Sequence, residues 1–315
     1  MKIFFTAEYN EEELKPLYEM GDVVLDGWAL GLPKMEEDEL VKKTKDADII
    51  ITNKVVLDSK ILSSLPKLKL ICVSATGTNN IDIEYAKTHN IAVKNVAGYS
   101  THSVAQHTLM LALSLLGRLP YYSQYVQQGQ WCKSEIFCHL TYDLQDLYGK
   151  QWGIIGYGSI GKQVCHLAKA FGAEVSYHST SGNNTQNDIP HKSLDEILKT
   201  SDIISIHAPL NNTTQNLIAK EQLQMLKKGA ILLNLGRGGI VNEKDLAQAL
   251  QIQDFLFGTD VLEKEPMIAN HPLLDSKIAH KVIITPHIAW AYKDTKDRLL
   301  QMVAENIKQF LNANG

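Results

Sequence analysis

The chain has 315 residues, of which 44% are hydrophobic and 21% charged, and its formal net charge is −4. This composition is typical of a globular protein with two domains, each with a sizeable core. It provides neither a basic surface for nucleic acid nor an acidic disordered tail, so we expect no nucleic-acid partner.

The N-terminal segment, MKIFFTAEYN, has one lysine and a three-residue apolar run, which is too little for a signal peptide. We therefore expect a cytoplasmic protein. Five β-branched runs then alternate with helical patterns such as Glu36–Lys45 and Ile83–His89. The predicted strands are Lys2–Thr6, Asp22–Leu25, Ile49–Thr52, Leu68–Val73 and Ile91–Lys94. The alternation predicts βαβ units and a parallel, doubly wound sheet of the flavodoxin-like type.

A long helix is predicted over Ser100–Leu116. Ser100 is a suitable N-cap, and apolar residues recur at helical spacing from Val104 to Leu115. The stretch Thr108–Leu116 is much shorter than the roughly 20 apolar residues of a membrane span, so we expect no membrane partner. Because the helix is apolar on more than one face, it should be buried on more than one side, between domains or against another subunit.

The second half of the chain predicts a Rossmann domain. Six strands are expected at Trp152–Ile155, Glu174–Tyr177, Ile203–Ile206, Ala230–Leu235, Phe257–Asp260 and Val282–Thr285. Helices are expected at Ser159–Phe171, Leu194–Lys199, Lys220–Leu226 and Glu243–Leu250. The final helix, Lys293–Leu311, carries an apolar stripe and should return to the first domain. We therefore predict a substrate domain of residues 1–99 plus 292–315, with a cofactor domain of residues 100–291 inserted in it.

A glycine-rich turn follows the first strand of the predicted Rossmann domain. Gly156, Gly158 and Gly161 form G-x-G-x-x-G between a strand and a helix, which is the context required for dinucleotide binding. An acidic residue near the end of the next strand would favour NAD, but Ser179 stands there with no arginine beside it. The expected cofactor is therefore NAD or NADP.

Three polar residues, Arg237, Glu265 and His287, follow later strands of the same domain. A guanidinium suits a carboxylate, a histidine suits proton transfer near neutral pH, and a neighbouring carboxylate favours the imidazolium. Each residue also has a structural interpretation: a surface ion pair or strand cap for Arg237, a turn for Glu265, and a buried histidine for His287.

From end to end, the chain resembles the D-isomer-specific 2-hydroxyacid dehydrogenase family. The matching stretches are SATGTNNID (74–82), GYSTHSVAQHT (98–108), GIIGYGSIGK (153–162), HAPLNNTTQNLI (207–218), NLGRGGIVNE (234–243), DVLEKEP (260–266) and TPHIAWA (285–291). The flanks look most like the glycerate dehydrogenase (hydroxypyruvate reductase) branch. The resemblance implies hydride transfer between NAD(P)H and C2 of a small 2-oxo acid such as glyoxylate, hydroxypyruvate or pyruvate.

The resemblance also implies site residues. Arg237 would bind the substrate, His287 would be the acid/base, and Glu265 would pair with His287. The substrate would also meet the backbone of Thr76 and Gly77, and Trp290 either lines the pocket or serves in packing. The expected cofactor contacts are Thr108, Gly156, Gly158, Ser159, Ile160, Gly161, Ser179, Ala208, Pro209, Thr214, Leu235, Gly236, His287 and Asp260, the last near the nicotinamide carboxamide. A homodimer through the helix after Ser100 is implied as well.

Two alternatives stay open. The first is a non-enzymatic NAD(H)-sensing module of the same fold, although no basic DNA-binding stripe supports it. The second is a metal site at Cys132, Cys138 and His139, which lacks paired C-x-x-C spacing, so reduced thiols and no metal are expected. The histidines without motif support are predicted to be structural or exposed: His102, His107, His139, His166 and His191.

Overall fold

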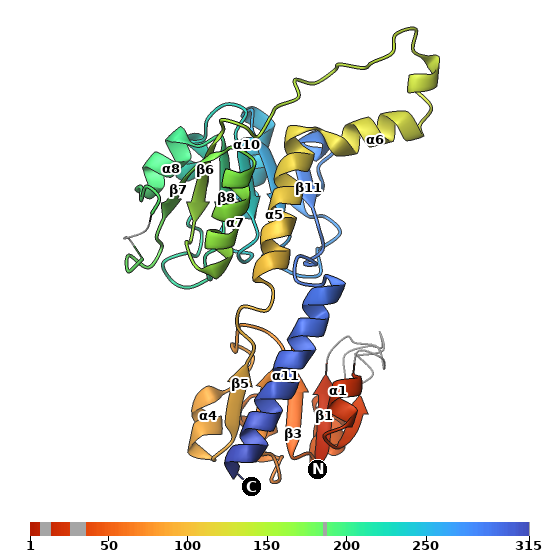
Figure 1. The fold of residues 1–315 in the computed structure, drawn as a ribbon, viewed down its shortest axis with the longest axis vertical. Coiled ribbons are helices and arrows are strands. Elements are labelled where there is room, and N and C mark those ends of the chain that lie inside the picture. Colours follow the sequence, from red (N-terminus) through yellow and green to blue (C-terminus); the bar gives the residue numbers. More distant parts are fainter. Residues whose placement is uncertain (7–13, 26–35, 185–187, 315) are drawn as a thin grey trace. The chain divides into compact units, whose positions relative to one another are not determined.

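The computed structural model describes residues 1–6, 14–25, 36–184 and 188–314. The chain folds as two units, Met1–Ser100 with Tyr292–Gly315, and Thr101–Ala291. It passes from one to the other twice, after Ser100 and after Ala291 (Figure 1).

The first unit contains a parallel five-stranded sheet in the order β2-β1-β3-β4-β5. Its strands are β1 (Lys2–Thr6), β2 (Asp22–Leu25), β3 (Ile49–Thr52), β4 (Leu70–Val73) and β5 (Ala92–Asn95). Its helices are α1 (Lys15–Tyr18), α2 (Glu37–Thr44), α3 (Ser59–Ser63), α4 (Ile83–Thr88) and α11 (Lys293–Asn314). This is the flavodoxin-like strand order, as predicted.

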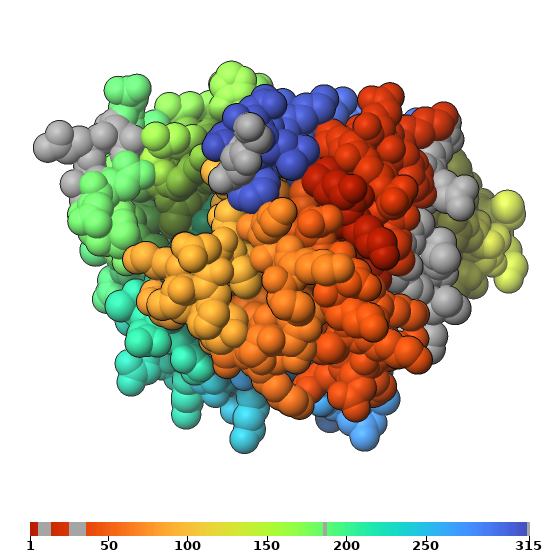
Figure 2. Space-filling view, turned by 90° about the horizontal axis from the view of Figure 1, so that it is seen from below, coloured from red at the N-terminus to blue at the C-terminus, as the bar shows by residue number. Residues whose placement is uncertain are grey.

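Helix α11 joins the first unit although it ends the chain. Leu299, Val303 and Ile307 are fully buried, and the helix contacts β4 and α1. On the face shown in Figure 2, α11 (blue) lies beside the N-terminal residues (red). Because the expected stripe of apolar residues needs a partner, α11 packs on the unit that offers an uncovered apolar surface.

The second unit contains a parallel six-stranded sheet in the order β11-β10-β9-β8-β6-β7. Its strands are β6 (Gln151–Ile155), β7 (Glu174–His178), β8 (Ile203–Ile206), β9 (Ile231–Asn234), β10 (Leu256–Thr259) and β11 (Val282–Ile284). Its helices are α5 (Thr101–Leu116), α6 (Leu119–Gln127), α7 (Ser159–Ala170), α8 (Leu194–Thr200), α9 (Lys220–Gln224) and α10 (Glu243–Ile252). A single parallel bridge, Tyr177 to His191, lies beside β7, where the Rossmann order places a third strand.

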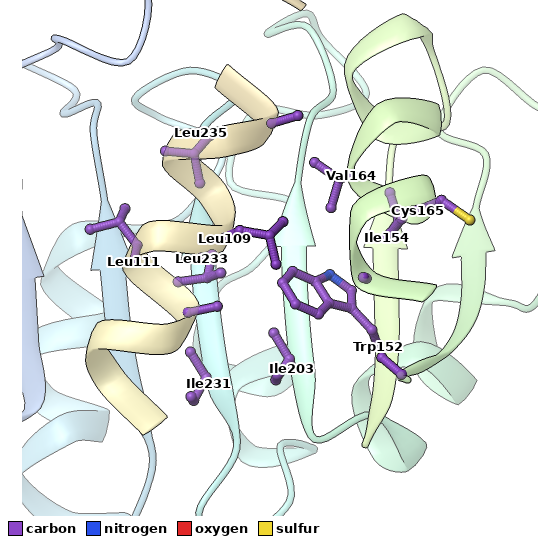
Figure 3. Packing of buried hydrophobic residues seen from close by; sticks show 14 of the residues in the cluster. Leu109, Leu111, Trp152, Ile154, Val164, Cys165, Ile203, Ile231, Leu233 and Leu235 are labelled. Carbon is purple, nitrogen blue, oxygen red and sulfur yellow. The ribbon is translucent and has the colours of Figure 1, made fainter. Parts of the chain in front are cut away.

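Helices cover both faces of this sheet. Ile154 belongs to a core that includes α5 and α7 residues, and its neighbour Ile155 belongs to a core with α8, α9 and α10. Figure 3 shows Trp152 packed between the strands and the two helices. The Trp152 indole N–H donates to Ser205 Oγ over 2.9 Å, which satisfies a buried polar group.

The predicted strands and long helices are confirmed, with several ends displaced by one or two residues. Short helices such as α1 and α3 were missed because four or five residues show no periodicity. Helix α6 was not predicted, and none of its residues is buried. Helix α5 is buried mainly within its own unit, against α7, β9 and β10, with Met110 and Leu113 exposed.

Candidate active site

The glycine-rich turn lies at the carboxyl end of β6, the strand at which the order of strands in the sheet reverses. Strand β7 lies on one side of β6 and β8 on the other, so a crevice between β6 and β8 is the expected ligand position in such a sheet. Gly156 has φ +91°, and a Cβ there would lie 2.7 Å from Ala208 N. Only glycine permits this approach of the two strand ends.

The backbone beyond the turn is arranged to receive a phosphate group. Gly158 precedes α7, and a Cβ there would meet nothing within 4 Å. Ser159, Ile160 and Gly161 form the first turn, whose N–H groups lack helical acceptors and lie at the positive end of the helix dipole. A dinucleotide pyrophosphate fits this open, donor-rich turn.

The end of β7 lacks a carboxylate. Ser179 is buried, its N–H donates to His191 Nε2 over 3.4 Å, and its hydroxyl accepts from the Asn184 N–H. His178 Nδ1 lies 3.1 Å from Lys192 O. Neutral side chains therefore occupy the position where an acid would bind an adenosine ribose.

Apart from Asp260 and His287, which follow β10 and β11, the other predicted cofactor contacts follow β8 and β9, with one in α5. Gly236 lies close to Ala208, because a Cβ on Gly236 would be 2.8 Å from Ala208 O. Thr214 is buried and donates to Pro209 O over 2.6 Å, which fixes the loop after β8. The remaining two are Leu235, which is buried after β9, and Thr108, which is buried in α5 with its hydroxyl bonded to Val104 O. Their roles stay predictions.

His207 directly follows β8 at the crevice, and its imidazole is unusual. Both ring nitrogens are buried, and among the described residues neither has a hydrogen-bond partner. Burial lowers the pKa of His207 from 6.5 to about 3. The ring is therefore neutral at physiological pH, and it adds no positive charge to the crevice.

This burial predicts an acid-dependent loss of stability. In the unfolded chain His207 binds a proton below its ordinary pKa, whereas in the folded chain it stays neutral until about pH 3. The free energy of unfolding therefore falls as the pH drops from about 6.5 toward 3. His207→Gln should lose less unfolding free energy than the wild type between pH 7.5 and 4.5, measured in urea. The exposed His280→Gln is the control; equal losses in wild type and His207→Gln would contradict the assignment.

The three predicted chemical residues follow three adjacent strands. Arg237 comes after β9, Glu265 after β10 and His287 after β11, all at the carboxyl edge of the same sheet. The loops are in contact, because a Cβ on Gly238 would lie 2.0 Å from the carbonyl carbon of Leu262. A side chain at position 238 is therefore excluded, and the β9 and β10 loops pack backbone against backbone.

Glu265 and His287 form a direct pair. Glu265 Oε2 lies 2.6 Å from His287 Nδ1, and Glu265 Oε1 accepts the Leu262 N–H over 2.9 Å. The two side chains are 35% and 27% exposed, so the pair is open to a ligand on one side. His287 Nε2 makes no hydrogen bond within the described part of the chain. The carboxylate thus fixes the ring and leaves Nε2 available.

Arg237 is exposed and has no carboxylate partner among the residues described by the structure. Its Nη1 donates to Gly236 O over 2.9 Å, and Asn234 Nδ2 donates to the Arg237 carbonyl over 2.9 Å. The strand-end contacts fix its backbone, whereas most guanidinium donors are left for an anion.

A second histidine–carboxylate pair stabilises the loop that follows β10. His271 Nε2 lies 2.8 Å from Glu243 Oε2, and Glu243 Oε1 accepts the Glu263 N–H over 2.6 Å. Both side chains are nearly buried. The pair anchors the loop that carries Glu265 to the start of α10.

Asp260 anchors the loop that carries His287. Its carboxylate accepts the Ile288 N–H at Oδ1 over 2.9 Å and the Ala289 N–H at Oδ2 over 2.8 Å. The Thr285 hydroxyl donates to Oδ1 over 2.6 Å, and His107 Nε2 lies 2.9 Å from that hydroxyl. The side chains of Asp260 and His107 are 2% and 1% exposed, so this network is internal.

Thr76 and Gly77 lie in the first unit, in the loop after β4. Asn95 Nδ2 donates to Thr76 O over 2.6 Å, and the Thr76 hydroxyl donates to Val96 O over 3.3 Å. A Cβ on Gly77 would meet nothing within 4 Å, and no described group accepts from the Gly77 N–H. The loop is thus fixed by β5 and leaves a backbone donor exposed. Trp290 is half-buried in the second unit.

Comparison with known proteins decides the family. Residues 109–289 match the NAD-binding domain of the D-isomer-specific 2-hydroxyacid dehydrogenases. The chain is 40% identical, over 87% of both chains, to a putative 2-hydroxyacid dehydrogenase of Haemophilus influenzae. The chain belongs to this family. It is also 37% identical to the glycerate dehydrogenase of Methylorubrum extorquens, over 87% of this chain and 86% of that one. A similar match is the hydroxypyruvate reductase of Blautia hydrogenotrophica, which is 35% identical over 88% of this chain and 86% of that one.

The solved structures agree. The D-lactate dehydrogenase of Aquifex aeolicus, complexed with NAD and lactic acid, superposes with a TM-score of 0.81 at 27% identity, over 99% of this chain and 96% of that one. The chain is accordingly an NAD(P)-dependent D-2-hydroxyacid dehydrogenase, with a Rossmann domain that binds the cofactor.

The dehydrogenase contains functional candidates that sequence reasoning missed. His107 was predicted to be structural or exposed; it is buried and joined to Asp260 through Thr285. The signal available was its motif, AQHT, in a stretch that carries the family resemblance. Its partner lies far along the chain, so spacing alone could not reveal the contact. Among the described residues, no helix could cross a membrane, and no cluster of three potential ligands could hold a metal ion.

Proposed function

We propose that Arg237, Glu265 and His287 carry out the reduction of a small 2-oxo acid. The observation that carries the proposal is the Glu265–His287 pair, half-exposed and on the same sheet edge as the dinucleotide turn. When bound, NAD(P)H supplies a hydride to C2 of the substrate. His287 Nε2 donates a proton to the carbonyl oxygen, which becomes the hydroxyl of the D-2-hydroxy acid.

Each residue has a role that follows from its contacts. Glu265 holds Nδ1 of His287 and thereby directs Nε2 outward. Arg237, which has no acidic partner in the described structure, binds the substrate carboxylate through its planar fork. We assign the first unit as the substrate domain, because the exposed N–H of Gly77 and the neighbouring Thr76 backbone suit a substrate carboxylate. Trp290 is assigned to the pocket wall.

The cofactor assignment includes both nicotinamide dinucleotides. A carboxylate after β7 would repel the 2′-phosphate of NADPH, and Ser179 removes that repulsion. His178, Ser179 and the nearby hydroxyls can also bond an unphosphorylated ribose. We therefore propose that NADH and NADPH are both accepted.

Initial rates of NADH and NADPH oxidation test this function. The substrates are glyoxylate, hydroxypyruvate, pyruvate and longer 2-oxo acids, and we expect turnover with at least one of the three small acids. The ranking of substrates identifies the 2-oxo acid, and the two cofactors show what Ser179 permits. Tight NADH binding with no turnover on any acid would instead favour an NAD(H)-sensing module.

We further propose a homodimer through α5, the helix after Ser100, in which the arm formed by residues 119–146 also covers a second copy. The arm extends from the rest of the second unit (Figure 1). Tyr125 stacks on His139 with ring centroids 3.9 Å apart, which shapes the arm internally. Its surface nevertheless leaves Ile136, Phe137 and Leu140 exposed, Phe137 by 88%. Contiguous apolar surface of this kind marks an interface, and a twofold dimer covers it on both copies.

The double variant Phe137→Asp/Leu140→Asp should sediment as a monomer, because each aspartate must be desolvated in the interface. Sedimentation equilibrium of the wild type should give twice the chain mass. Ile252→Asp is the matched control, since Ile252 is 83% exposed on α10, outside the arm. A wild type that stays monomeric at micromolar concentration rules the dimer out.

We also place the protein in the cytoplasm, because its four cysteines are unpaired, as is usual in reducing compartments. Cell fractionation tests this localisation.

A further inference from the structure

The loop after β11 holds its acid/base candidate in an uncommon backbone conformation. His287 has φ +54°, a left-handed value that residues other than glycine seldom adopt. Such a conformation persists only where the surroundings determine it. The residues that do so here are Ile288 and Ala289, whose N–H groups are both held by the Asp260 carboxylate.

Proton counting determines how Asp260 itself is held. Thr285 has a single hydroxyl proton, and the 2.6 Å distance to Asp260 Oδ1 requires that this proton lie between the two oxygens. The Thr285 oxygen must then accept from His107 Nε2, at 2.9 Å. His107 is therefore the Nε2–H donor at the start of the chain His107–Thr285–Asp260. Burial lowers the pKa of His107 and the nearby Asp260 opposes this, so the neutral tautomer is the relevant one.

We propose that His107 is a positioning residue of the dehydrogenase, which acts through Thr285 and Asp260 to fix the 285–289 loop and the direction of His287. The inference rests on the proposed role of His287. The hydrogen bond of His107 with Thr285 connects α5, at the start of the second unit, to the loop at the end of the same unit. His107 touches none of the reacting atoms; its effect is on the orientation of the proton donor.

The test uses the full-length protein and an isosteric change. Thr285→Val removes the hydroxyl but keeps the shape, whereas Thr285→Ser keeps the hydroxyl. His107→Phe removes the donor, and His107→Gln retains an N–H near the Nε2 position. We expect Thr285→Val and His107→Phe each to lower kcat by about 10-fold to 100-fold, because small misplacements of a reacting group are costly. The Kd for NADH should change less than threefold, and Thr285→Ser and His107→Gln should recover most of the rate.

Two further readouts separate positioning from general stability. The double variant His107→Phe/Thr285→Val should have a kcat no lower than that of the worse single variant, because the two residues act through one chain of hydrogen bonds. Amide hydrogen exchange at Ile288 and Ala289 should accelerate in Thr285→Val while the β6 amides stay protected. Unchanged exchange at both amides overturns the inference whatever the activity. A loss confined to NADH affinity also overturns it, because Asp260 would then act on the cofactor.

The outcome for His287 distinguishes the two proposals. If His287→Asn is inactive but a loosened loop in Thr285→Val leaves kcat intact, the positioning role is wrong and the acid/base role stands. If His287→Asn is itself fully active, the acid/base role fails and this inference fails with it.

Discussion

His287→Asn is expected to lower kcat/KM for the 2-oxo acid by about 100-fold to 10,000-fold, the usual contribution of a positioned general acid. Asparagine suits the test, because it tolerates the left-handed backbone that His287 adopts at φ +54° better than most residues. The loop held by Asp260 should therefore keep its shape, and only the proton donor is lost. Stopped-flow single turnovers with NADH would measure the reduction step directly.

The control for this experiment is His280→Asn. His280 is exposed shortly before β11, and within the described ranges its only hydrogen bond is the one that its carbonyl accepts from Arg118 Nη1. It should retain wild-type turnover. The Kd for NADH should rise far less than kcat/KM falls, since His287 is one expected cofactor contact among many and the dinucleotide turn lies after β6. Wild-type turnover in His287→Asn would remove His287 from the mechanism.

Gly156→Ala should abolish tight NADH binding and destabilise the protein. The new Cβ would lie 2.7 Å from Ala208 N and 2.8 Å from the His207 carbonyl carbon, both backbone atoms that cannot rotate away. The φ of +91° adds backbone strain. Overpacking and strain together cost about 2–5 kcal/mol. Urea unfolding measures the stability, and quenching of protein fluorescence by NADH measures the affinity.

Gly158→Ala separates the two effects. A Cβ at Gly158 meets nothing within 4 Å, so the unfolding free energy should change by less than about 1 kcal/mol. The methyl group would nevertheless occupy the open backbone where we expect the pyrophosphate, and the Kd for NADH should rise at least about tenfold, a cost of about 1.4 kcal/mol. If Gly158→Ala bound NADH normally, the phosphate position after β6 would be incorrect.

Local sequence patterns determined most of the fold. The β-branched runs, the helical spacings and the G-x-G-x-x-G turn predict two parallel α/β sheets and the order of their elements. Strand and helix periodicities are local, so they survive in the sequence without any partner. The candidate residues Arg237, Glu265 and His287 could also be identified in advance, because each directly follows an expected strand and the ends of parallel strands share one edge.

Contacts between distant residues could be decided only by the tertiary structure. The AQHT motif marked His107 only as part of a family-like stretch, and nothing in the sequence indicated that it bonds to Thr285 on another element. The apolar character of α5 predicted burial on more than one side, but did not say that most of that burial lies within its own unit. The exposed arm from Leu119 was not predicted, and no residue of its helix α6 is buried. Sequence periodicity determines which faces need a partner, whereas the packing of the whole chain determines which partner each face finds.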